Sequence, residues 1–269
     1  MPITTLSGIV AIVLYLLSLS FQSRAIKNAN SARIRAGSTV ITLGIIAVAA
    51  HALSAWLLIA RSDGFHFGIL QISTLIFSAI ALLAILTNAR KPLGSLIMGV
   101  FPFAILAIVL SLAIESDYPA QQLSAGLVGH VLLSVMAYSF VTLASLQAAF
   151  LAFQNYQLRH QHAASVIKRF PPLQDMEKLL FELLWIAQVL LSLAIVAGFV
   201  FVEDLTAQGL PHKMFFSILA WIVFAALLWG RHQLGWRGNT AIRGTLTGFF
   251  LLILGFYGSK FVIEYILGG

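Results

Sequence analysis

The chain contains no cysteine and few charged residues: only 9% of its 269 residues are Asp, Glu, Lys or Arg. The absence of cysteine excludes disulfide bonds, thiolate metal ligands, cysteine nucleophiles and covalent cofactor attachment through a CxxCH motif. Neither a GxxxxGK[ST] nor an HExxH motif is present, so the sequence gives no indication of a P-loop phosphate site or of a zinc site of the HExxH type. Any bound cofactor must therefore be held by His, Met or Tyr side chains, or by packing.

Apolar residues, by contrast, are abundant. They make up 60% of the chain, and the mean hydropathy is +0.96, which is outside the range of soluble globular domains. Runs of about 20 apolar residues are long enough to cross a hydrocarbon core of about 30 Å. We therefore predict an all-α, polytopic membrane helix bundle forming a single integral membrane domain, residues 1–269. The predicted spans are 3–22, 36–60, 67–87, 93–114, 124–153, 180–202, 214–230 and 240–264.

Lys and Arg predict the orientation of these eight spans. Thirteen of the sixteen basic residues lie in the loops after the first, third, fifth and seventh spans. Short loops rich in Lys and Arg stay in the cytoplasm, so both termini are predicted on the outer, periplasmic side. The first span follows an uncharged start and lacks a small-residue cleavage site, so we expect it to be retained. The net charge of +7 then reflects topology, and binding of nucleic acid is not expected.

The predicted topology sorts the seven histidines into two groups. His51 in the second span lies roughly 14 Å below the outer surface, and His130 in the fifth span lies roughly 9 Å deep. His66 and His212 lie at the outer mouths of the third and seventh spans. Three histidines lie among cytoplasmic basic residues and are interpreted as solvated or in contact with headgroups: His160, His162 and His232.

Polar groups inside a bilayer are costly and indicate function by default. A neutral histidine hydrogen-bonded to a neighbouring helix explains either intramembrane histidine taken alone. Two histidines at similar depth on different spans instead favour a shared ligand. The fifth span adds a polar stripe, because His130, Ser134, Tyr138 and Ser145 fall on one helical face. Two further features are interpreted as structural: the GxxxG spacing of Gly244–Gly248 and the pair Lys260 and Glu264.

Two neutral imidazoles from separate helices are the usual ligands of non-covalently bound haem b in a membrane bundle. A hydrolytic zinc site or a proton relay would need a carboxylate, and no acidic residue lies in the central part of any predicted span. The sequence therefore predicts haem binding by His51 and His130, with no catalytic activity of the chain itself.

Three segments resemble a known family. They are "GHVLLSVMAYSFVTLASLQAAFLAFQ", "MEKLLFELLWIAQVLLSLAIVAGFVF" and the closing pair that contains "LLWGRHQLGWRG" and "GSKFV". Together they resemble the cytochrome c assembly superfamily, and are similar to its small YpjD-like and HemX-like inner-membrane members. The resemblance implies that His130 corresponds to the first of two outward-facing haem ligands. It implies that His51 corresponds to an intramembrane haem ligand.

The chain also departs from the larger members of that superfamily. Their tryptophan-rich loop before the seventh span is missing, since residues 186–220 contain no tryptophan. The second outward-facing histidine would fall near "FVIEYILGG", which has none. The second intramembrane histidine would fall near Trp229, with His232 shifted toward the cytoplasm. His212 is therefore the best substitute ligand, and the relatives' complete four-histidine set is not present.

These observations predict a multi-pass protein of the bacterial inner membrane that binds or handles haem and assists cytochrome c assembly or haem homeostasis. Its expected partners are haem, the lipid bilayer and another membrane protein of cytochrome biogenesis. Two alternatives stay open. One is a haem-free accessory or scaffold subunit of another membrane protein, and the other is a small-molecule permease, which the absence of mid-membrane charge disfavours.

Overall fold

A computed structural model describes residues 2–27, 32–90, 95–114, 118–159, 172–201 and 210–266. Within these ranges, eight helices are long and apolar enough to cross a membrane, as the hydropathy predicts. Seven spans are single helices: α1 Ile3–Lys27, α2 Ala32–Ile59, α3 Ile69–Arg90, α4 Ser95–Ala113, α5 Ala125–Arg159, α7 Leu173–Phe201 and α8 Leu210–Gln233. The eighth consists of α9 (Asn239–Ile253), the π-helical turns η2 (Leu254–Gly258), the short α10 (Ser259–Phe261) and η3 (Val262–Ile266).

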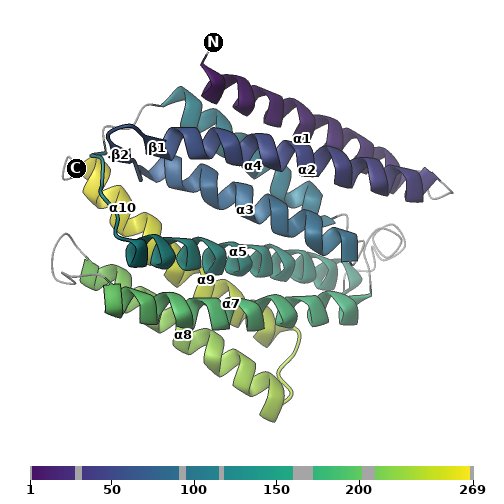
Figure 1. Ribbon diagram of the computed structural model, residues 1–269. Coiled ribbons are helices and arrows are strands. Elements are labelled where there is room, and N and C mark those ends of the chain that lie inside the picture. The colour runs from purple at the N-terminus through teal and green to yellow at the C-terminus, as the bar shows by residue number, and fades with distance from the viewer. Residues whose placement is uncertain are drawn as a thin grey trace. The chain divides into compact units, whose positions relative to one another are not determined.

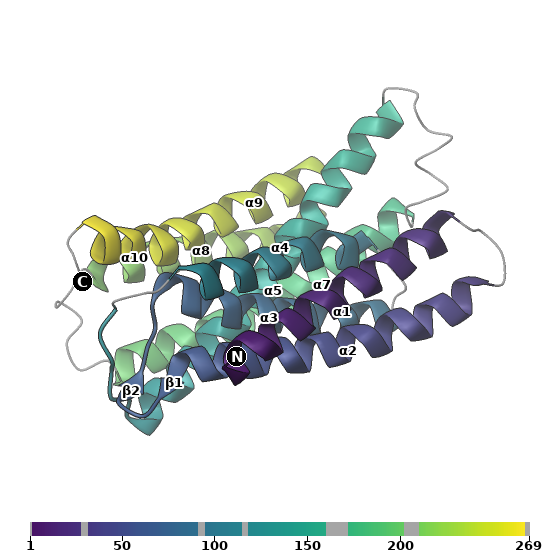
Figure 2. The same cartoon turned by 90° about the horizontal axis from the view of Figure 1, so that it is seen from above.

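The chain divides into two compact units, residues 1–122 and 123–269. In the first unit, α1 packs against α2 and α4, and α3 packs against the same two helices (Figure 1, Figure 2). A short antiparallel hairpin, β1 (Ala60–Arg61) and β2 (Gly64–Phe65), joins α2 to α3. Hydroxyls tie α1 to α2, since Ser18 Oγ donates to the Val40 carbonyl at 3.1 Å and Ser54 Oγ donates to the Thr4 carbonyl at 3.0 Å.

The second unit has the same connectivity. There α5 packs against α7 and α9, and α8 packs against the same two helices. The helices of this unit alternate in direction, so α5 and α8 begin at the end of the unit where α7 and the eighth span finish. The prediction of one domain over residues 1–269 is not tested by this division, and the orientation of the termini stays a prediction.

The predicted boundaries differ from the observed ones most in two spans. Helix α5 continues to Arg159 instead of residue 153, and α7 begins at Leu173 instead of residue 180. Helix α7 starts early because the polar segment before its apolar run packs against α5. Met176 is buried, and its carbonyl accepts a hydrogen bond from Gln147 Nε2 at 3.0 Å. Pro172 precedes α7, and its carbonyl accepts from the Asp175 amide at 3.0 Å. A proline fits there because the first helical amides have no partner within the helix.

Large apolar side chains cover the outside of both units. In a soluble protein so much exposed apolar surface would cause aggregation, whereas in a bilayer it contacts lipid. Helix α1 shows this clearly, with six large apolar side chains between 41% and 68% exposed: Ile3, Leu6, Val10, Val13, Leu16 and Leu17.

The GxxxG pair has the structural role predicted for it. A Cβ on Gly244 would lie 3.1 Å from Leu227, and one on Gly248 would lie 2.4 Å from the buried ring of Phe224. These two glycines let α9 approach α8 closely enough for those side chains to pack on its backbone.

The motif "LLWGRHQLGWRG" forms the turn between α8 and α9. Trp236 packs directly over Gly230, where a Cβ would come within 2.3 Å of the indole. Gly238 has φ 54° and ψ −122°, a conformation open only to glycine, and its amide donates to Glu177 Oε1 at 2.7 Å. Arg231 Nη1 lies 3.9 Å from the same carboxylate. The distinctive residues of this motif therefore close the turn and attach it to α7.

Candidate functional site

His130 lies in the second turn of α5 and is anchored to α7. Its Nδ1 lies 2.9 Å from the carbonyl oxygen of Ala194. Because a carbonyl only accepts, Nδ1 must carry the proton, and in the neutral ring Nε2 then carries the lone pair. Among the described residues, Nε2 has no hydrogen-bond partner. This is the arrangement of a metal-ligating histidine, in which one nitrogen is fixed by a backbone carbonyl and the other is available.

Glycines make room for this anchor. The imidazole of His130 lies over Gly198, where a Cβ would come within 3.1 Å of Cε1 and 3.4 Å of Nδ1. One turn earlier on α5, Gly126 accommodates the ring of Phe201, at a distance of 2.3 Å from a hypothetical Cβ. The start of α5 and the end of α7 are thus held close together, and the orientation of the imidazole is fixed by that contact.

Tyr138 lies two turns further along α5, in an aromatic cluster. Its ring centroid lies 6.3 Å from that of Phe249 and 5.8 Å from those of both Phe256 and Tyr257. The Tyr138 hydroxyl is buried and has no hydrogen-bond partner among the described residues. Such a group loses about 1–3 kcal/mol of hydration without replacement. An acceptor on a bound ligand would satisfy it, and π-helical turns like the one that supplies Phe256 and Tyr257 are frequent at functional sites.

Other hydroxyls on this side of α5 form hydrogen bonds within their own helix. Thr142 and Ser145 donate to the carbonyls one turn earlier in their own helix, those of Tyr138 and Val141, at 2.8 and 2.9 Å. Ser134 is half-buried. Of the predicted stripe, Ser145 is thus engaged within its own helix, whereas His130 and Tyr138 each keep a polar atom without a partner among the described residues.

His51 has a different environment, in the core of the first unit. Its side chain is fully buried, with 0% exposure. Nδ1 lies 3.2 Å from the Tyr15 hydroxyl on α1, and Nε2 lies 2.8 Å from Thr74 Oγ1 on α3. A neutral imidazole has one donor and one acceptor, so these two hydroxyls satisfy it completely. Ligation of a metal by His51 would require one of the two hydroxyls to move away.

The sequence reasoning missed these partners of His51. Tyr15 lies in the middle of the first span, where its hydroxyl must find a partner within the protein, and this was the available signal. Thr74 gave no comparable signal, because threonine is common in membrane helices. The contacts of His130 with Ala194 and Gly198 likewise cannot be predicted without knowing how α5 and α7 pack.

The other histidines are distributed as follows. His212 is exposed in the first turn of α8, at the end of the second unit where α5 begins. His232 is exposed in the last turn of α8, at the opposite end, and Trp229 is 60% exposed. His160 and His162 lie outside the described residues. The described part of the chain contains no group of three or more His, Asp or Glu side chains that could hold a metal ion.

Lys260 and Glu264, for which a structural role is predicted, form an ion pair with Nζ and Oε2 separated by 4.0 Å. Both side chains are only 8% exposed. The pair lies in the last turns of the eighth span, and its mutual contact compensates part of the cost of burying each charge.

A family model described as "Cytochrome C assembly protein" matches residues 10–267. The inner membrane protein YpjD of Escherichia coli K12 is 29% identical over 262 residues, which is 96% of this chain and 98% of that protein. An uncharacterized 28.8 kDa protein in the nifR3-like 5′ region of Azospirillum brasilense is 24% identical over 225 residues, covering 80% of this chain and 82% of that protein. No solved structure matches the chain.

Proposed function

The chain belongs to the cytochrome c assembly protein family and is a multi-pass inner-membrane protein, and on this premise we propose that it binds non-covalent haem b through His130. The observation that carries this proposal is the anchoring of His130 Nδ1 to the Ala194 carbonyl at 2.9 Å, which leaves Nε2 as the ligand atom. In this role the protein assists cytochrome c assembly or haem homeostasis and catalyses no reaction itself.

His130 and the aromatic cluster around Tyr138, two turns further along α5, would together suit a large, flat ligand with polar edges. Haem, when bound, would supply an iron that can take an imidazole nitrogen as a ligand. Tyr138 offers a buried hydroxyl without a partner among the described residues, and aromatic rings surround it. His212 lies at the same end of the unit and is the best-placed second imidazole there, since it is exposed in the first turn of α8.

His51 is a weaker ligand in this proposal, although the resemblance implies one. Both of its ring nitrogens are engaged by hydroxyls within a fully buried site. The role of His51 as an axial ligand stays a prediction, and it requires the loss of the contact with Tyr15 or with Thr74.

The proposal is tested by the visible spectrum of the full-length protein purified in mild detergent from haem-supplemented cells. We expect a Soret band whose haem occupancy falls at least severalfold in His130→Ala and, to a smaller extent, in His212→Ala. His232→Ala is the matched control, because His232 is exposed at the opposite end of α8, and its spectrum should equal that of the wild type. Equal occupancy in His130→Ala and the wild type would overturn the assignment.

A second function is favoured by a specific observation. The closed hydrogen-bond network around His51 is what a histidine retained for packing would have, and this supports a haem-free accessory or scaffold subunit of another membrane protein of cytochrome biogenesis. This function predicts a colourless preparation from haem-supplemented cells that copurifies with a partner membrane protein. A monodisperse, haem-loaded preparation without a partner would exclude it.

A further inference from the structure

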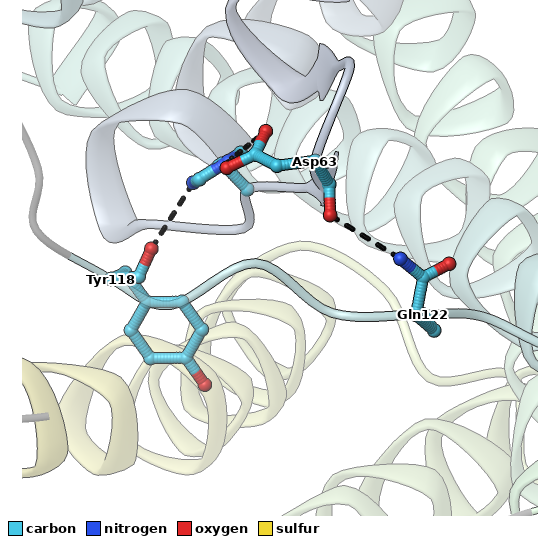
Figure 3. Close-up of polar contacts among 4 residues, drawn as sticks. Asp63, Tyr118 and Gln122 are labelled. Atoms are coloured by element: carbon cyan, nitrogen blue, oxygen red, sulfur yellow. Dashed lines mark hydrogen bonds and ion pairs between the residues drawn. The ribbon is translucent and has the colours of Figure 1, made fainter.

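The hairpin between α2 and α3 is attached to a distant segment of the first unit. Residues 118–122 run alongside it, and Phe65 and Gln121 exchange both backbone hydrogen bonds, at 3.0 and 2.9 Å. Gly64 has φ 137°, and a Cβ there would lie 3.2 Å from the Gln121 carbonyl, so glycine permits the close approach. Gln122 Nε2 adds a bond to the Asp63 carbonyl at 3.3 Å (Figure 3).

His66 completes this attachment with both ring nitrogens. Its Nε2 lies 3.1 and 3.0 Å from the two carboxylate oxygens of Asp63. Its Nδ1 lies 3.3 Å from the carbonyl oxygen of Tyr118, which is labelled in Figure 3. We call these three residues the His66 clasp.

The two contacts of His66 together require a proton on each of its ring nitrogens. A carbonyl and an ionised carboxylate can only accept hydrogen bonds, so each nitrogen of His66 must donate. A neutral imidazole has a single N–H, and it can therefore make only one of the two contacts. Both contacts exist together only when His66 is the doubly protonated imidazolium ion.

The surrounding charges keep the carboxylate ionised. The hydrogen bond from His66 is the main cause that holds the pKa of the Asp63 carboxyl below its usual value of 3.8, and Arg61 contributes in the same direction. The remaining titratable group is the phenol of Tyr118, which accepts from Gln121 Nε2 at 3.3 Å. Glu115 and Asp117 lie outside the described residues.

We infer that protonation of His66 controls how firmly the segment that leads into α5 is held to the hairpin. In the protonated form, His66 holds the hairpin and residue 118 together, and loss of one ring proton releases one of the two contacts. The segment ends at Gln122, three residues before α5 begins. Mild acidity thus tightens the attachment of residues 118–122 to the hairpin within the first unit, independently of whether haem is bound.

Hydrogen exchange of the full-length protein in phosphatidylcholine nanodiscs tests this inference. The readout is the protection of peptides covering the Phe65 and Gln121 amides between pH 5.5 and 8, after division by the intrinsic exchange rates. We expect protection to fall roughly two- to fivefold as pH rises, the size of one exposed charge-assisted hydrogen bond. The pH dependence should vanish in His66→Gln, whose side chain has no titrating proton, and persist in His232→Gln.

Asp63→Asn is a second variant that retains the imidazole. Its amide oxygen still accepts but carries no charge, so the fall in protection should be smaller than in the wild type. A wild type whose protection does not change with pH overturns the inference. The inference is also overturned if His66→Gln keeps the full pH dependence of protection. Should His66→Gln fail to fold, the full pH dependence in Asp63→Asn overturns the inference instead.

Discussion

Tyr15→Phe and Thr74→Val remove, one at a time, the two hydroxyls that satisfy His51. Neither change alters the shape of the core much, because the phenyl ring keeps its packing on Phe101, at 4.6 Å between centroids, and valine is nearly isosteric with threonine. Each leaves one nitrogen of a histidine with 0% exposure without its hydrogen-bond partner.

The magnitude follows from two opposing effects. An unpaired buried polar group costs about 1–3 kcal/mol. Interhelical hydrogen bonds in membrane proteins average only about 0.6 kcal/mol, with a maximum of about 1.7, because the unfolded chain in the membrane also finds partners. We therefore expect a loss of about 1–2 kcal/mol for each variant, with Thr74→Val the larger because its bond is 2.8 Å long against 3.2 Å for Tyr15.

The assay is reversible unfolding in mixed detergent micelles, in which about 1–2 kcal/mol changes the folded-to-unfolded ratio roughly 5- to 30-fold. Tyr265→Phe is the control, since Tyr265 is 52% exposed and should change the free energy of unfolding by less than about 0.5 kcal/mol. His51→Leu combined with both substitutions removes every member of the network, and it should cost less than the sum of the single changes. Single variants no less stable than Tyr265→Phe would refute a structural role for the network.

Three further predictions concern the second unit and the hairpin. Gly198→Val should displace the His130 imidazole, which lies 3.1 Å from the position of a Cβ, and lower haem occupancy in the spectral assay; Gly129→Ala, with nothing within 4 Å, should not. Gly238→Ala should reduce the free energy of unfolding by about 1–3 kcal/mol, measured in the same micelles, because its backbone conformation is open only to glycine. The lowered pKa of Asp63 means that its contribution to the hairpin is present above its usual value of 3.8 and is lost as pH falls through the lower folded value. Hydrogen exchange of the hairpin at acidic pH should therefore show weaker protection than at pH 5.5, and a monotonic gain in protection on acidification would contradict this.

Several features were predictable from the sequence because they depend on local composition. Eight spans follow from runs of apolar residues, since an isolated helix must satisfy its backbone internally to cross a bilayer. The GxxxG pair and the pairing of Lys260 with Glu264 follow from spacing within one helix. Errors in span boundaries arose where polar residues continue a helix beyond its apolar run, as at the start of α7.

The environment of each histidine required the tertiary structure. A membrane helix is apolar on its lipid-facing side as well as on its packed side, so periodicity does not reveal which face meets which neighbour. His51 and His130 looked equivalent because both are imidazoles at similar predicted depth in apolar spans.

Packing gives the ring nitrogens of the two histidines different hydrogen-bonding environments. Residues 36 and 23 positions away saturate both nitrogens of His51, whereas a carbonyl 64 positions away fixes one nitrogen of His130 and leaves the other with no partner among the described residues. The sequence determined which polar groups enter the membrane, because that depends on composition along the chain. Only the rotation and approach of neighbouring helices decided which of those groups keeps a nitrogen to offer a ligand.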